Sequence, residues 1–159
     1  MYYDHGDPMD NNVGKIVSSI EQDYGRKDGL SQLDIAIVDQ SNDHVLALVE
    51  IEETTDRPKT LMGDLFGVLF GEYLSFKRKT LKVGLFTTLL VTGIGDAAFE
   101  QRNQHILRVA EKAKASLGTK NSEIGTLIMR VFSNGDELLA GVPLELVTIV
   151  KRGLAAAAS

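Results

Sequence analysis

The chain has 159 residues, a length that suits a single domain with its own hydrophobic core. It contains no cysteine, which excludes disulfides and thiolate chemistry, and its 43% hydrophobic and 25% charged residues are typical of a soluble globular protein. The net charge of −5 argues against a protein that binds nucleic acid by bulk charge alone.

Residues 1–10 are polar and acidic, unlike a signal peptide, and we expect them to form a loose tail. The longest apolar run, VGLFTTLLVTGIG, is too short to span a bilayer. We therefore expect one domain over residues 1–159, in a cytoplasmic protein with no membrane partner. A helix is predicted from Asp10 or Asn11 to about Asp23, with Glu21 near its end. The apolar face of this helix would consist of Val13, Ile16, Val17 and Ile20.

The next stretch, residues 33–53, predicts a hairpin of two strands, LDIAIVD and VLALVEIEE, joined by the polar turn QSNDH. Both strands are apolar on both faces, as in the centre of a sheet that is covered on both sides. Centring the hairpin on Asn42 fixes which residues lie opposite each other and share a face. The predicted pairs are Asp34 with Glu50, Ala36 with Leu48, and Val38 with Leu46.

Three acids interrupt these apolar strands. Asp34 and Glu50 would be neighbours, and Glu52 would lie on the same face opposite Gln32. Like charges so close favour a bound cation, and oxygen ligands of this kind suit Mg²⁺ or Mn²⁺. The alternative is that the acids at the strand ends simply face solvent.

TTDRP then leads into a predicted helix from about Lys59 to Phe76. Gly63, Gly67 and Gly71 recur at intervals of four and would form one smooth stripe along it. The stripe indicates close packing, either on the sheet of the same domain, which we favour, or against a second copy in a homodimer.

The remaining elements predict a strand over VGLFTTLLVT, and a helix from about Ala97 to Leu117 capped by Asp96. A strand over residues 126–133 and a turn at NGDE follow, and PLELVTIVKR fits either a strand or a short helix. GIGDAA resembles a nucleotide-binding loop but lacks the third glycine spacing, so a capped turn is the simpler interpretation.

Positive charge is concentrated late in the chain: residues 57–159 carry 14 bases against 9 acids. Any phosphate-binding surface must therefore come from this part. The densest cluster would contact a nucleic-acid backbone or, as a plainer alternative, form a solvated helix end. It consists of Lys77, Arg78, Lys79 and Lys82.

The arrangement of an acid on one strand, an acid-x-acid motif ending the next, and a following helix resembles the PD-(D/E)xK nucleases, which have the restriction-endonuclease-like fold. The resemblance covers residues 13–92 and implies an α/β protein with a mixed central sheet flanked by helices and an αββαβ core. It implies Asp34 and Glu50 as metal ligands, helped by the carbonyl of Ile51, and Glu21 as the glutamate of the first helix.

The sequence departs from the family at Glu52, which occupies the position of the lysine. Either Glu52 serves as general base or second ligand, or Lys59 has taken over the role of the lysine. The resulting hypothesis is a metal-dependent nuclease whose partner is nucleic acid, DNA rather than RNA. The alternatives are a catalytically inactive relative that serves as a binding or assembly module, and a small nucleotide-binding protein that uses GIGD.

Overall fold

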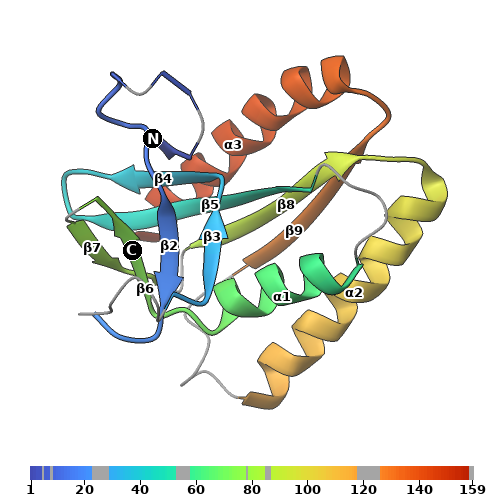
Figure 1. Cartoon of the computed structure of the whole chain (residues 1–159), viewed down its shortest axis with the longest axis horizontal. Helices are drawn as coiled ribbons and strands as arrows, with labels where there is room; N and C mark the ends of the chain where they lie inside the picture. The colour runs from blue at the N-terminus through green and yellow to red at the C-terminus, as the bar shows by residue number, and fades with distance from the viewer. Residues whose placement is uncertain are drawn as a thin grey trace.

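The computed structural model describes residues 1–4, 6–7, 9–22, 29–52, 58–77, 79–84, 87–117 and 126–157. In this part of the chain two β-sheets and three helices make up an α/β fold (Figure 1). The side chains of Glu52 and Lys59 lie outside the description, although both backbones are placed.

The larger sheet is mixed, as predicted. Its strand order is β1-β4-β5-β8-β9, with β4 antiparallel to β5, and with β5, β8 and β9 parallel to one another. Its strands are β1 (Tyr2–Tyr3), β4 (Ile35–Asp39), β5 (His44–Glu52), β8 (Thr88–Ile94) and β9 (Thr126–Phe132). The edge strand β1 comes from the stretch that was expected to be a loose tail.

A second, antiparallel sheet of four strands was not foreseen. Its order is β3-β2-β6-β7, and it combines segments that are far apart in the sequence. Its strands are β2 (Ile16–Ser19), β3 (Ser31–Leu33), β6 (Tyr73–Phe76) and β7 (Lys79–Lys82).

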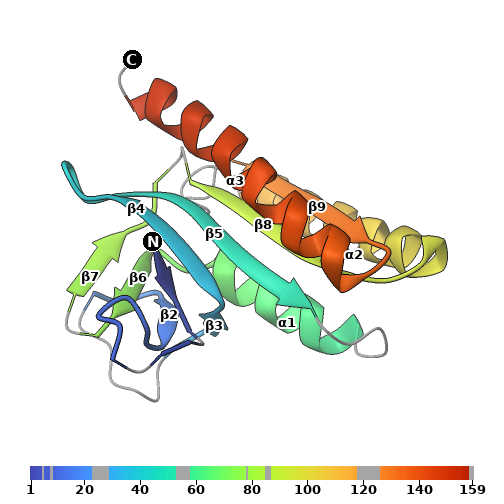
Figure 2. The same cartoon turned by 90° about the horizontal axis from the view of Figure 1, so that it is seen from above.

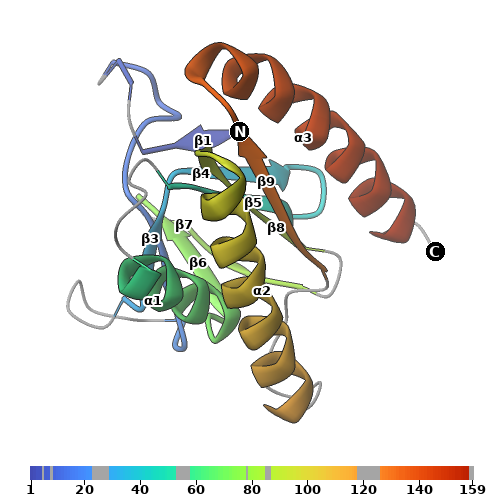
Figure 3. The same ribbon diagram turned by 90° about the vertical axis from the view of Figure 1, so that its right-hand side faces the viewer.

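The helices cover the larger sheet on both faces (Figures 2 and 3). One face is covered by α3 (Gly135–Ala157). The opposite face is covered by α1 (Pro58–Leu69), α2 (Ala97–Leu117) and the second sheet. None of the described helices is long and apolar enough to cross a membrane.

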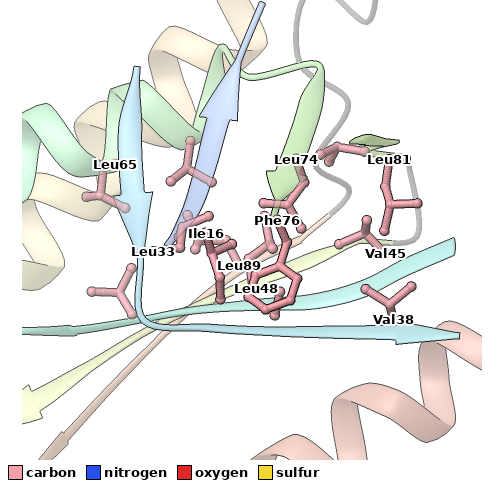
Figure 4. Close-up of a cluster of buried hydrophobic side chains, with 14 of the residues drawn as sticks. Ile16, Leu33, Val38, Val45, Leu48, Leu65, Leu74, Phe76, Leu81 and Leu89 are labelled. Atoms are coloured by element: carbon pink, nitrogen blue, oxygen red, sulfur yellow. The ribbon is translucent and has the colours of Figure 1, made fainter. Parts of the chain in front are cut away.

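Alternation along β5 sends its side chains into two separate cores. Leu48 joins the core between the two sheets, where it meets Leu33, Leu74 and Leu89 (Figure 4). Ala47 and Val49 point the other way, into the core beneath α3, with Leu90, Val142, Leu146 and Ile149. Because both faces of the larger sheet are buried, its central strands are apolar throughout.

The helix predicted up to Asp23 is wrong, because Ile16–Ser19 form the strand β2 instead. Gly14, with φ of 154°, breaks any helix that begins near Asp10. The β-branched pair Ile16 and Val17 favours a strand when a partner is present, and β3 and β6 supply partners on both sides.

The helix predicted from Lys59 to Phe76 is too long. Helix α1 ends at Leu69, and the chain turns at Gly71 into β6. A Cβ at Gly71 would lie 2.9 Å from the Ser18 Cβ, so only glycine lets the chain pass β2 so closely. The aromatic sequence YLSF then pairs with β2 as a strand.

Near the C-terminus, NGDE is not a turn between elements but the beginning of α3. Asn134 caps this helix, because its Oδ1 accepts the Glu137 N–H at 3.0 Å. The helix continues through Pro143 over the whole of PLELVTIVKR, so the strand alternative for that stretch is wrong. The predicted strand over residues 126–133 and the Asp96-capped helix are confirmed as β9 and α2, whereas the strand predicted over residues 83–92 is β8 at Thr88–Ile94 and so begins five residues later.

Candidate functional site

The candidate site begins at a bend in the chain at Asp34. Leu33, before it, pairs with Ile16 in the second sheet, and Ile35, after it, pairs with Val49 in the larger sheet. The single strand predicted over residues 33–39 is therefore two strands, β3 and β4, and Asp34 is the point where the chain changes sheets.

The carboxylate of Asp34 replaces a strand partner at this bend. Its Oδ2 accepts the backbone N–H of Ile51 at 2.7 Å, and its own N–H donates to the Val49 carbonyl at 3.2 Å. β4 does not extend alongside Ile51, so the carboxylate supplies the acceptor that the ladder would otherwise provide. This contact also holds the Asp34 side chain against the end of β5 that carries the other two acids.

The predicted hairpin register is confirmed for the pairs farthest from the turn. Ala36 pairs with Leu48, as predicted, and Ile35 pairs with Val49. The prediction that Val38 lies opposite Leu46 is wrong, because a bulge between Ile37 and Val38 shifts the pairing to Val45. The bulge lies toward the turn, so it leaves the register at the acid-bearing end unchanged. Asp34 lies one residue beyond the last of these pairs, and its hydrogen bonds to Val49 and Ile51, on either side of Glu50, hold it at this end of β5.

Glu50 lies on the same side of β5 as Leu48, which faces the core between the sheets. The residue is half-buried, and its Oε2 atom is fully buried. On the neighbouring strand it pairs with Val91 of β8. Glu50 is therefore at the carboxyl end of a parallel strand, the edge where ligands bind in open α/β sheets.

The structure does not bring every predicted site residue together with these acids. Glu52 ends β5 beside Gly93, and Lys59 is in the first turn of α1, but both side chains lie outside the described part. Glu21 is an exposed residue just beyond β2, so its predicted place on a first helix is wrong.

Asp4 is a neighbour of the site that the sequence did not reveal. The β1–β4 pairing places it next to Asp34, and the Asp4 N–H donates to the Asp34 carbonyl at 2.9 Å. Its carboxylate accepts a hydrogen bond from the Gln32 side chain. No local pattern identifies Asp4, because β1 has only two residues and is too short to show the alternation of a strand.

The donor chemistry of Asp34 and Glu50 fits Mg²⁺ or Mn²⁺, ions that take one or two carboxylates and complete their shells with water or phosphate oxygens. Both side chains are half-buried at the same end of the hairpin. Among the side chains that the structure describes, no group of three or more acids or histidines is close enough to hold a metal.

Of the basic cluster, Lys79 lies at the other end of the hairpin. Lys79 forms an ion pair with Asp43 in the β4–β5 turn, and this carboxylate raises the pKa of Lys79. The Lys77 ammonium donates to the Asn11 carbonyl at 2.8 Å. Seven residues of extended chain separate Asp43 from Glu50, roughly 20 Å. Lys82 is exposed at the end of β7, and Arg78 lies outside the described residues.

The GIGD segment forms a capped turn. Asp96 Oδ1 accepts the Phe99 N–H at 2.9 Å, which caps α2. A cavity of about 340 Å³ lies beside it, between the ends of β8 and β9, and its lining includes the carboxylates of Asp96 and Glu100. Two acids are a poor environment for a phosphate group, so this cavity does not favour the nucleotide-binding hypothesis.

These elements define an α/β protein with a mixed five-stranded sheet, a second antiparallel sheet and, in the described residues, three helices. Comparison with known protein families, curated proteins and solved structures found no match for the chain.

Proposed function

We propose that this protein is a metal-dependent nuclease, a divergent relative of the PD-(D/E)xK enzymes that hydrolyses phosphodiester bonds in DNA. The observation that supports the proposal is that Asp34 is hydrogen-bonded to Val49 and Ile51, the two neighbours of Glu50 at the carboxyl end of β5. β4, β5, α1 and β8 follow the order of the ββαβ part of the core that the resemblance implies, with the strands β6 and β7 inserted between α1 and β8.

Asp34 and Glu50 would hold Mg²⁺ or Mn²⁺, together with the carbonyl of Ile51. Such an ion, when bound, would lower the pKa of a water molecule and stabilise the charge that develops on the phosphate. The Asp34 carboxylate is held in place by the Ile51 N–H, which limits how far it must reorganise to bind a cation. Glu52 or Lys59 would orient the attacking water.

The positively charged β6–β7 hairpin would contribute to DNA binding at a distance from the reaction. Lys77 and Lys79 are exposed there, and Lys79 is paired with Asp43, roughly 20 Å along β5 from Glu50. A DNA strand that runs from the acids to this hairpin would contact the lysines several phosphates away from the bond that is cleaved. The proposed role is therefore to hold the backbone and not to take part in the reaction.

A non-catalytic binding or assembly module is the second candidate. Glu52 in place of a lysine favours it, as do the ion pair and the hydrogen bond that already engage Lys79 and Lys77. Titration calorimetry with Mg²⁺ and Mn²⁺ separates the two, because the inactive module would bind neither ion at millimolar concentration.

The nuclease proposal is tested by incubating the purified protein with supercoiled, linear and single-stranded DNA and with RNA, in Mg²⁺, Mn²⁺ or EDTA. We expect cleavage of DNA that needs the metal. Asp34→Asn and Glu50→Gln should each lower the rate about 100-fold or more, because each removes a ligand charge.

The matched control is Asp39→Asn, which changes an acid at the opposite end of the same hairpin and should leave the rate unchanged. Cleavage that persists at the same rate in both Asp34→Asn and Glu50→Gln would reject the proposed site. Absence of metal-dependent cleavage of every substrate, together with no metal binding, would leave the module as the explanation.

A further inference from the structure

Helix α3 has an apolar outer side in addition to the side that packs on the sheet. Val142, Leu146 and Ile149 are buried beneath it. Four large apolar residues of α3 are exposed: Leu139 at 72%, Leu144 at 71%, Val147 at 53% and Leu154 at 43%, and the last three lie together on the outer side. Figure 2 shows α3 along the edge of the molecule, with no described element outside it. Single exposed leucines are ordinary, but several along one helix mark an interaction surface.

The outer side has the repeat of a two-stranded helix pair. Six exposed positions follow one another at alternating intervals of three and four residues, which is the a/d spacing of a coiled coil. We refer to them as the outer seam of α3: Glu137, Ala140, Leu144, Val147, Lys151 and Leu154. Because this spacing keeps one row of side chains facing a partner helix, the fitting occupant is another helix that lies along α3.

The charges of the seam identify its partner as a second copy of the same helix. Glu137 and Lys151 lie seven residues before and after Leu144, and their neighbours Asp136 and Arg152 have the same signs. A parallel copy would bring like charges together. An antiparallel copy, with Leu144 opposite Val147, brings Glu137 of one helix within about one turn of Lys151 of the other. Antiparallel helix dipoles add to this preference.

We propose that the protein forms a two-fold symmetric homodimer through the outer seams of two antiparallel α3 helices. The same patch on both copies satisfies the self-complementarity that a two-fold interface requires. The seam from Glu137 to Leu154 is roughly 27 Å long, as one helix face. One helix face of this length buries less surface than the ~800 Å² per partner of standard interfaces. We therefore expect the dimer to dissociate at micromolar concentration.

This dimer differs from one built on the glycine stripe. A Cβ at Gly67 would lie 2.6 Å from the Ser31 Cβ, and one at Gly71 would lie 2.9 Å from the Ser18 Cβ, so both glycines already pack on the second sheet of their own chain. It also leaves the acids accessible, because α3 covers the face of β5 opposite to the side of Leu48 and Glu50. An experiment that rejects the dimer would therefore leave the nuclease proposal standing, and one that rejects the nuclease proposal would leave the dimer standing.

The test is sedimentation velocity of the purified chain over about 1 μM to 1 mM protein, a range that brackets micromolar dissociation constants. We expect a monomer–dimer equilibrium in the unchanged protein. Leu144→Glu should weaken dimerisation at least tenfold, because it buries an unpaired charge in the seam. The matched control is Leu139→Glu, an equally exposed residue of α3 outside the seam, which should dimerise as the unchanged protein does.

Charge exchange tests the orientation separately. Lys151→Glu should weaken the dimer, and adding Glu137→Lys should restore it, with circular dichroism showing that each variant remains folded. A monomer over the whole range overturns the proposal, and monomers that co-sediment with anionic lipid vesicles would assign the seam to a membrane surface. A dimer that Leu144→Glu leaves intact also overturns it, because the interface must then lie elsewhere.

Discussion

Asp34 joins the two sheets through its backbone and its side chain. Its position between β3 and β4 lets the chain cross from one sheet to the other, and its carboxylate accepts the Ile51 N–H at 2.7 Å. A residue in this place has a structural role whether or not a metal binds. Substitutions at Asp34 must therefore separate the loss of charge from the loss of the hydrogen bond.

We expect Asp34→Ala to lower the free energy of unfolding by about 1 to 3 kcal/mol, because the Ile51 N–H loses a charged acceptor in a half-buried site. Asp34→Asn keeps an acceptor oxygen and should cost less than about 1 kcal/mol. Urea denaturation followed by circular dichroism measures both values. Equal stability of the alanine and asparagine variants would show that the hydrogen bond contributes nothing.

At the scale of elements, α1 is held against the second sheet by close backbone approach. The Ser18 hydroxyl donates to the Gly67 carbonyl at 2.9 Å, and the Leu30 carbonyl lies 2.8 Å from where a Gly67 Cβ would be. The first glycine of the stripe has a different environment, because a Cβ at Gly63 would meet nothing within 4 Å. The regular spacing of the glycines therefore does not reflect one shared contact.

These two glycines form a matched pair for experiment. Gly67→Ala should destabilise the protein by about 1 to 3 kcal/mol, because its methyl group would overlap the Ser31 Cβ and the Leu30 carbonyl. Gly63→Ala should instead stabilise it by up to about 1 kcal/mol through higher helix propensity. Thermal unfolding of both variants gives the comparison, and a loss of stability in Gly63→Ala would reveal a contact on the open side of α1.

At the scale of the whole molecule, acids concentrated in residues 1–56 make stability depend on pH. The Tyr3 hydroxyl donates to Asp10 and lowers its pKa, and the Ser41 hydroxyl and N–H together lower the pKa of Asp39. A lowered pKa means that the folded state binds fewer protons than the unfolded state between the two values. This stabilisation is complete above the ordinary aspartate pKa, about 3.9, and is lost as the pH falls through the lower folded values.

The free energy of unfolding should therefore decrease as the pH is lowered from about 5 to 3, measured by urea denaturation at each pH. The decrease should be small, because both side chains are in contact with solvent, which screens their charges. Asp39→Asn keeps the turn acceptor but has no proton to gain, so its profile should be flatter than that of the unchanged protein. A variant profile that parallels the original would show that Asp39 does not contribute.

Elements stabilised by local interactions could be predicted from the sequence. The β4–β5 hairpin has its turn and its two apolar strands within residues 35–52, so centring it on Asn42 predicts the observed pairs from Ile35 to Ile37. The capping residue Asp96 likewise precedes α2 directly. The bulge at Val38 has no such signal, because one extra residue leaves the apolar pattern of the strand unchanged.

The second sheet was decided only by tertiary structure. β2 and β6 are more than fifty residues apart in the sequence, and each is a four-residue segment that has no strand partner until the chain folds. Local propensity alone therefore assigned both segments to helices. The same is true of Asp4, which reaches Asp34 only when β1 pairs with β4.

The sequence by itself thus determined the β4–β5 hairpin and the capped helix α2, since their hydrogen bonds are local. The tertiary structure alone decided that Asp34 lies where the chain changes sheets, that Lys79 lies at the other end of the hairpin, and that α3 exposes a second apolar side. Strand pairing between distant segments and burial of a helix face depend on the assembled chain, so no local pattern specifies them.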